Sequence, residues 1–324
     1  MRKATKTNND TINNAYVQGY HSQNGHYIGG ESYAFAGFEA NKYFTSDRYK
    51  KTSVNADGQL VREDGKPLKA IGLEIETECH SIVDQQVLAN VYDKIIFKLF
   101  PAGLFKMQND SSLGGRTNAE CITQLMTKEF IRNNYKNFKS MWNEYFPMFG
   151  ITTQNDSCGM HVNLSLGLFG TSKKTQDDAI RKLYYLINKH YDLFTVAFNR
   201  TNGTRWCARC IDYTSAKTFD LEHMSASHGN ALNYSHYHAG RIEIRLVGGQ
   251  KNYACFRNTM ETVFHLIDAV KVLSWNDLDD ITKVFSGCNN YVYDRLSSNV
   301  YRRGFITQTQ LDAIAPTVKQ VQYL

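Results

Sequence analysis

The stretch IGLEIETE at residues 71–78 decides the fold prediction, because its side chains alternate strictly between two kinds. Glu74, Glu76 and Glu78 share one face at a period of two, and Leu73 and Ile75 share the other. This alternation predicts a β-strand with an apolar back and an ionisable front. Taken alone, such a strand is an ordinary sheet strand with its back on the core and its front in water.

Two further stretches, GMHVNLS at residues 159–165 and RIEIRL at residues 241–246, alternate in the same way. Their polar faces carry His161, Asn163 and Ser165 in the first stretch and Arg241, Glu243 and Arg245 in the second. No front contains Lys, although ordinary solvent faces do. If the fronts meet in one cavity, their carboxylates require cations that offset the repulsion between them. Carboxylates with one imidazole favour Mg²⁺ or Mn²⁺ over zinc, so the spacing predicts a divalent-metal site on a sheet.

Two more acidic residues belong with this set, in QNDSSL at residues 108–113 and NAECI at residues 118–122. Glu120 alternates with Ala119 and Cys121, so we expect its side chain to point away from an apolar face. Asp110 lies in a turn-like segment, where an Asx turn or a helix cap explains it as well as metal binding does.

Long amphipathic segments separate the strands and indicate helices. The sequence predicts helices at residues 85–100, 128–146, 176–198 and 257–273, and strands near 71–78, 118–125, 158–166, 230–237 and 240–247. Thr175 is the predicted N-cap of the third helix, with Asp177 and Asp178 in its first turn. Sheet and helices interleave without Gly-rich phosphate loops at strand ends, which favours an α+β fold over a doubly wound one.

The chain divides into three predicted parts. Residues 1–69 form a polar and aromatic N-terminal extension, in which the two Asp-Gly pairs of NADGQLVREDGKP at residues 55–67 indicate a small hairpin. Residues 70–275 form the main domain, and residues 276–324 form a C-terminal helical tail packed on it.

Composition excludes several classes of protein. The chain has 324 residues, 42% of them apolar and 21% charged, with 4 prolines, which excludes disordered and collagen-like chains. No apolar run approaches the ~18 residues of a membrane span, and the 7 cysteines show no disulfide framework. We therefore expect a soluble, cytoplasmic protein. Half of the net charge of +6 lies in the first 70 residues and the other half is spread over the rest, which indicates a mildly basic surface and not a polyanion-binding arm. We therefore expect no nucleic-acid partner, and the oligomeric state stays open.

Four motifs in order, IGLEIETE, NDSSL followed by AE, SCGMHVN, and RIEIR followed by LVGG, resemble those of the amidoligase family. These carboxylate-amine ligases are related to glutamine synthetase and glutamate-cysteine ligase. The resemblance covers about residues 70–270. It implies a glutamine synthetase-like domain, a curved antiparallel sheet with helices packed on one face, that holds divalent cations and ATP.

Roles carry over from this resemblance position by position. The implied metal ligands are Glu74, Glu76, Glu120, His161, Glu243 and Asp110. Glu76, Glu243 and Arg245 would serve catalysis, and Arg245 matches the arginine that faces phosphate or a substrate carboxylate. Asn163 is a further candidate for binding the nucleotide. Residues 199–230 do not align with the family position by position, and the loop cations there are candidates for binding the nucleotide and stabilising the transferring phosphoryl group: Arg200, Arg205, Arg209 and Lys217. Asn233 matches a position that would contact substrate.

The implied reaction is ATP-dependent formation of an amide or isopeptide bond. A substrate carboxylate attacks the γ-phosphate of ATP, and an amine captures the resulting acyl phosphate. The residues that bind the amine and act as base stay unassigned. A free amino acid, a peptide, a cell-wall fragment or a protein side chain would each suit the same metal residues, and a bacterial or a phage origin stays open.

Three rival interpretations were weighed. Cys207, Cys210, His223 and His228 match a zinc-finger spacing, but Tyr213 and Leu221 are each one position off the usual places, and we predict no stoichiometric zinc. Cys158 lies near His161 but lacks an orienting third group, so we interpret it as a small residue at a strand start and not as a nucleophile. The last rival is a catalytically silent sheet that serves as a binding or structural module, with a zinc-stabilised loop at the Cys and His positions.

Overall fold

Helices and antiparallel strands build the protein in this computed structural model, which confirms the α+β prediction. The structure describes residues 15–17, 32–34, 42–45, 48–55, 60–108, 110, 113, 117–154, 157–200, 206–221 and 229–316. The chain forms two compact units of interleaved sequence. The first comprises Met1–Ser53, Ala70–Asn163 and Gly249–Tyr253, and the second comprises Val54–Lys69, Leu164–Gly248 and Ala254–Leu324.

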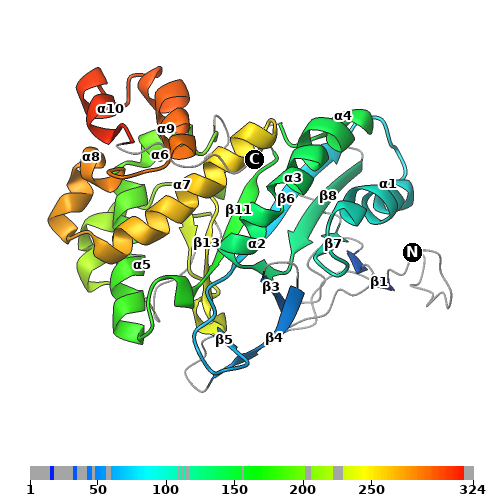
Figure 1. Ribbon diagram of the computed structural model, residues 1–324, viewed down its shortest axis with the longest axis horizontal. Coiled ribbons are helices and arrows are strands. Elements are labelled where there is room, and N and C mark those ends of the chain that lie inside the picture. Colours follow the sequence, from blue (N-terminus) through cyan, green and yellow to red (C-terminus); the bar gives the residue numbers. More distant parts are fainter. Residues whose placement is uncertain are drawn as a thin grey trace. The chain divides into compact units, whose positions relative to one another are not determined.

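The first unit is built on strand β6 (Ile71–Cys79), which the sequence predicts almost to the residue. It pairs antiparallel with β8 (Thr117–Thr123), and β8 pairs antiparallel with β7 (Phe105–Gln108) (Figure 1). On its other side β6 pairs with β11 (Met160–Ser165). The remaining strands that lie or begin in this unit are β1 (Ala15–Val17), β2 (Ser32–Ala34), β3 (Lys42–Thr45), β4 (Arg48–Val54), β9 (Leu125–Met126) and β10 (Ile151–Thr152).

Strands from the first 54 residues join this sheet. β2 pairs antiparallel with β1 and with β7, so Ser32 stands opposite Gln108. β3 pairs antiparallel with β4 and parallel with β9. Part of the predicted extension therefore extends the sheet that carries the acidic motifs.

Apolar side chains on the backs of the strands form the core of this unit. Leu73, Ile75 and Cys121 have at most 1% of their surface exposed, as the alternation predicts. An aromatic layer continues the core, in which Phe97 stacks on Phe105 of β7 with ring centroids 4.3 Å apart. Because burying large aromatic side chains is a major source of stabilisation, this layer ties the helices to the sheet.

The helices of the first unit are less regular than predicted. The predicted helix 85–100 is a helical run that changes from α1 (Gln85–Val91) to the π-turn η1 (Tyr92–Ile96) and the 3₁₀ turn η2 (Phe97–Leu99). The predicted helix 128–146 is broken at Asn134, whose side-chain amide donates to the Phe130 carbonyl. Its parts are α2 (Lys128–Asn133), α3 (Tyr135–Ser140), η3 (Met141–Tyr145) and α4 (Phe146–Met148).

The second unit is mainly helical. The predicted strand 240–247 is β13 (Arg241–Ile244), and the predicted strand 230–237 shortens to β12 (Leu232–Asn233), which pairs antiparallel with it. β5 (Leu60–Arg62) leads into a turn at Gly65, where φ is +74°, so one of the two Asp-Gly signals does form a hairpin. Its helices are η4 (Leu166–Leu168), α5 (Lys173–Lys189), α6 (Tyr191–Ala197), η6 (Ile211–Thr218), η7 (Tyr237–Ala239), α7 (Tyr253–Val272), η8 (Trp275–Asp279), α8 (Ile281–Val284), α9 (Asn290–Arg295), η9 (Leu296–Tyr301) and α10 (Gln308–Ile314).

The predicted N-cap of the third helix is wrong. The Ser172 hydroxyl caps α5 by accepting a hydrogen bond from the Thr175 backbone N–H. The Thr175 hydroxyl accepts a hydrogen bond from the Ser172 backbone N–H in return. Thr175 is thus the third residue of the helix in a reciprocal capping box, and Asp177 lies beyond the first turn. Ser and Thr both cap well, so composition alone did not separate them.

The glycines of the LVGG motif allow two backbones to approach closely. A Cβ added to Gly248 would lie 2.4 Å from the Asn199 carbonyl oxygen in the second unit. A Cβ on Gly249 would overlap the Thr153 carbonyl oxygen in the first unit. Any larger residue would push these segments apart, which explains the two glycines without a catalytic role.

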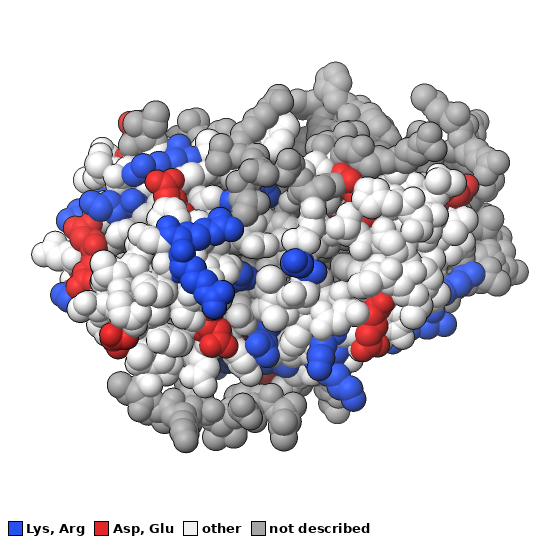
Figure 2. Space-filling view, turned by 90° about the horizontal axis from the view of Figure 1, so that it is seen from above, with Lys and Arg blue, Asp and Glu red and all other residues white. Residues whose placement is uncertain are grey.

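Two observations concern the surface and the membrane. Figure 2 shows Lys and Arg interspersed with Asp and Glu on one face of the protein, as expected for a mildly basic chain without a basic stripe there. Among the residues that the structure describes, no helix combines the length and the apolar character needed to cross a membrane.

Candidate metal centre

The front of β6 presents its three glutamates as predicted. Glu76 and Glu78 are buried, with 6% and 4% of their surface exposed, and Glu74 is partly buried. Carboxylates are rarely buried to this degree unless a cation or hydrogen-bond donors compensate them. The groups around these three glutamates therefore decide what this face of β6 can bind.

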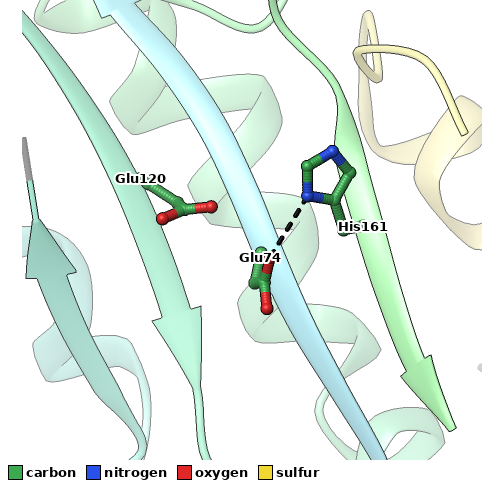
Figure 3. Close-up of side chains that lie close together, drawn as sticks. All are labelled: Glu74, Glu120 and His161. Carbon is green, nitrogen blue, oxygen red and sulfur yellow. Dashed lines mark hydrogen bonds and ion pairs between the residues drawn. The ribbon is translucent and has the colours of Figure 1, made fainter. Parts of the chain in front are cut away.

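Glu74, Glu120 and His161 form the first cluster, with one potential ligand atom from each lying within 4.8 Å of the others. Figure 3 shows Glu120 on β8, Glu74 on β6 and His161 on β11, three adjacent strands. His161 Nδ1 lies 3.2 Å from Glu74 Oε2, and its Nε2 lies 3.5 Å from Glu76 Oε1. One imidazole therefore bridges two carboxylates of β6.

Glu76, Asp110 and Glu120 form the second cluster, again with one potential ligand atom from each within 4.8 Å of the others. Glu76 and Glu120 stand directly opposite each other in the β6–β8 register. Glu120 belongs to both clusters and is the residue that joins them. Glu78 belongs to neither, and its Oε1 accepts a hydrogen bond of 2.6 Å from the Ser157 hydroxyl.

Burial and neighbouring acids disfavour the charged form of Glu120. Desolvation is the largest cause and repulsion by Glu74 the second, and together they raise the pKa of Glu120 from 4.5 to about 8, with His161 opposing them. A carboxyl in this state gains most from a cation that neutralises the cluster. The charged form of Glu120 is therefore disfavoured in the absence of a cation, and an ion bound there would displace a proton.

Hydrogen bonds hold the cluster carboxylates in place. The Gln108 side-chain amide donates to Glu120 Oε2 over 2.8 Å, and the Asn163 amide donates to Glu74 Oε1 over 2.9 Å. The Gly159 backbone N–H donates to Glu76 Oε2. Our sequence reasoning missed Gln108. The only signal was its place at the end of a short alternating stretch, and pairing with Glu120 follows from the strand register.

Glu243, Arg245 and Asn233 lie together in the second unit. Arg245 Nη1 is 2.8 Å from Glu243 Oε1, and the Asn233 side-chain amide donates to Glu243 Oε2 over 2.8 Å. Each oxygen of this buried carboxylate thus accepts a hydrogen bond. The structure brings these three predicted residues together, and their roles in metal, nucleotide and substrate binding stay predictions.

The predicted loop cations make other contacts. Arg209 and Lys217 are exposed and lie over the rings of Tyr213 and Trp275, at 5.1 and 5.4 Å from the centroids. Arg200 is buried, and its Nη1 lies 3.5 Å from the Val247 carbonyl oxygen. These contacts lie within the second unit and do not test nucleotide binding. That role stays a prediction for Arg200, Arg209 and Lys217.

Several predicted positions fall on residues that the structure does not describe. Arg205, His223 and His228 lie outside the described residues, so the structure leaves the zinc prediction untested. Cys207 is buried and Cys210 is partly buried. Cys158 has 2% of its surface exposed.

The donor set of the two clusters fits a hard divalent cation. Carboxylate oxygens predominate, one imidazole joins them, and neither cluster contains a thiolate. Such sets suit Mg²⁺ or Mn²⁺ better than a structural zinc, which favours Cys and His in a closed tetrahedral site. Two clusters that share one carboxylate could hold two ions side by side.

A scan against protein-family models finds no match for this chain, and a search of curated proteins finds no relative. The resemblance to amidoligases therefore rests on the four sequence motifs and stays a prediction.

Proposed function

We propose that the protein is an ATP-dependent ligase that joins a carboxylate to an amine and requires Mg²⁺ or Mn²⁺. One observation carries the proposal: two acidic clusters on a sheet share Glu120, so that six ligand positions are supplied by five side chains. Paired sites with a shared ligand are typical of enzymes that stabilise both the attacking and the leaving oxygen in phosphoryl transfer. The order of the motifs supports a glutamine synthetase-like sheet.

In this proposal the residues of the first unit bind the ions and fix their positions. Ions bound there would supply positive charge to the phosphate oxygens of ATP. His161, Glu74 and Glu120 would hold one ion, and Glu76, Asp110 and Glu120 the other. The sheet places Glu74, Glu76, Glu120 and His161 on neighbouring strands, whose register holds them in position, and Asp110 lies between β7 and β8.

The reaction itself needs no protein nucleophile. An oxygen of the substrate carboxylate forms a bond to the γ-phosphorus while the bond to the ADP oxygen breaks. The amine nitrogen then attacks the acyl carbon, the bond between this carbon and the phosphate oxygen breaks, and the nitrogen loses a proton to the departing phosphate or to a base that stays unassigned. The sequence resemblance assigns Arg245 to the phosphoryl group or the carboxylate and Asn233 to the substrate. A guanidinium suits either anion because it donates two parallel hydrogen bonds.

The proposal is tested by incubating the protein with ATP, Mg²⁺ and pools of carboxylates and amines, and measuring ADP. We expect metal-dependent ADP release with at least one pool, lost in Glu76→Gln and in Glu120→Gln. If no pool gives ADP and ATP does not bind in the presence of Mg²⁺ or Mn²⁺, the sheet is a binding or structural module and not an enzyme.

A further inference from the structure

Gln108 contacts the carboxylate that both clusters share. It is the last residue of β7, and the antiparallel register places it directly opposite Glu120 on β8. Side chains in such opposed positions interact directly across the strands. The 2.8 Å bond from Gln108 Nε2 to Glu120 Oε2 is thus built into the strand pairing.

The bond comes to Glu120 from β7, and β8 lies between β7 and β6. Figure 3 shows an oxygen of Glu120 directed toward β6, where Glu74 lies. The hydrogen bond from Gln108 restricts the orientation of the Glu120 carboxylate. Because Glu120 contributes a ligand atom to each of the two clusters, its orientation affects both of them.

Asn163 makes the equivalent contact with Glu74. Its side-chain amide donates to Oε1 over 2.9 Å, while Glu74 Oε2 faces His161 at 3.2 Å. In both places a neutral amide orients the carboxylate. A Lys or Arg would also donate, but its charge would lower the affinity for a metal ion by neutralising the carboxylate. A neutral donor orients the ligand and leaves its charge to the ion.

We propose that Gln108 is a positioning residue for the two-cluster metal centre, which holds the Glu120 carboxylate in the orientation in which it contributes a ligand atom to both clusters. The inference rests on the metal site of the proposed function and adds a residue that the motifs do not contain. Groups in this position around metal ligands typically change metal affinity by about 10- to 100-fold when they are removed.

The test compares Gln108→Met with Gln85→Met by titrating the full-length protein with Mn²⁺ and following free Mn²⁺ by electron paramagnetic resonance. Gln85 is a matched control because its amide also donates to a partner on β8, the Asn118 carbonyl oxygen, over 2.6 Å. Methionine has a similar length but no donor. We expect Gln108→Met to weaken Mn²⁺ binding by about 10- to 100-fold, and Gln85→Met to change it by less than about twofold.

Thermal unfolding in a chelator separates positioning from simple loss of stability. Similar melting temperatures for the two variants, with weakened Mn²⁺ binding in Gln108→Met alone, support the positioning role. Equal Mn²⁺ affinity in Gln108→Met and the wild type overturns it, as does an equal loss in both variants. Wild-type protein that binds no Mn²⁺ overturns this inference together with the metal-dependent function. Gln108-dependent Mn²⁺ binding without ADP release from any substrate pool overturns the ligase function alone.

Discussion

Glu120 in the first unit and Glu243 in the second are both buried, with 8% and 3% of their surface exposed, yet their surroundings differ. Glu243 has a guanidinium 2.8 Å away and a second donor in Asn233. Glu120 has a neutral amide on one oxygen, and its largest electrostatic neighbour is another acid, Glu74. The protein itself compensates the charge of Glu243. The charge of Glu120 would instead be compensated by an added cation.

Whether a buried acid is suited to bind a metal ion depends on its neighbours. A carboxylate paired with arginine must give up that pair before it can bind an ion, and this costs free energy. A carboxyl group among other acids, such as Glu120, has a raised pKa, so a bound ion displaces a proton there and offsets the repulsion between the acids. On this physical ground the acids of the first unit are the stronger candidates for binding a metal ion, and Glu243 is the weaker candidate of the predicted set.

The largest effect is expected from breaking the compensated pair. Arg245→Met removes the guanidinium from the buried Glu243 carboxylate, which should lower the free energy of unfolding by about 3–5 kcal/mol. Urea unfolding at pH 7 measures the loss. The double variant Arg245→Met/Glu243→Gln should recover most of it, because no charge is then left buried. Strictly additive losses in the double variant would show that the pair does not act as described.

The next-largest effect is expected on Mn²⁺ binding when Glu120, which lies among other acids, is replaced. Glu120→Gln removes a ligand from both clusters, so Mn²⁺ binding should fall by about 100-fold or more, or roughly 2.7 kcal/mol. Glu78→Gln is the matched control, since Glu78 lies on the same face of β6 but outside both clusters. Mn²⁺ titration of both variants measures the difference. Two Mn²⁺ ions bound by Glu120→Gln with wild-type affinity would contradict the shared ligand.

A pH dependence should follow from the same residue. The pKa of Glu120 is about 8 in the folded protein against 4.5 for an ordinary glutamate, mainly because of burial. Between these values the folded protein keeps a proton that the unfolded chain releases, so the free energy of unfolding falls as pH rises. Without metal we expect a loss of about 2 kcal/mol between pH 6 and pH 8, at about 1.4 kcal/mol per pKa unit.

Chemical unfolding in a chelator at pH 5, 6, 7 and 8 measures this slope. Glu120→Gln should flatten it, because the amide does not titrate. Saturating Mn²⁺ should flatten it as well, because the bound ion stabilises the carboxylate. A wild-type slope that rises over this range would contradict the assigned protonation of Glu120.

The sequence predicted the faces of the strands well because alternation is a local property. Glu74, Glu76, Glu120 and His161 were all placed on polar fronts, and the structure brings them together. The apolar backs at Leu73 and Ile75 are buried as expected. Period-two patterns carry this information directly, since each residue's face follows from its neighbours.

The sequence could not predict features set by long-range pairing. Gln108 meets Glu120 only because of the β7–β8 register, and β2 joins β7 although more than 70 residues separate them. The contact between Arg245 and Glu243 follows from a period of two, but its consequence for Glu243 depends on burial. The N-cap at Ser172 was missed because two good capping residues lie three positions apart.

The smallest effect is expected at a third buried acid, Glu78, which accepts a hydrogen bond from the Ser157 hydroxyl. Ser157→Ala removes the 2.6 Å hydrogen bond to Glu78 Oε1. Hydrogen bonds to charged groups contribute about 1.5–3 kcal/mol, so the free energy of unfolding at pH 7 should fall by about 1.5 kcal/mol, less than in Arg245→Met. Mn²⁺ affinity should not change, because Glu78 belongs to neither cluster. Urea unfolding and Mn²⁺ titration of the same variant test both halves. Weakened Mn²⁺ binding in Ser157→Ala would mean that the metal centre extends along β6 to Glu78. Glu78 would then belong with Glu120, as an acid that a metal ion compensates, and not with Glu243, which the protein itself compensates.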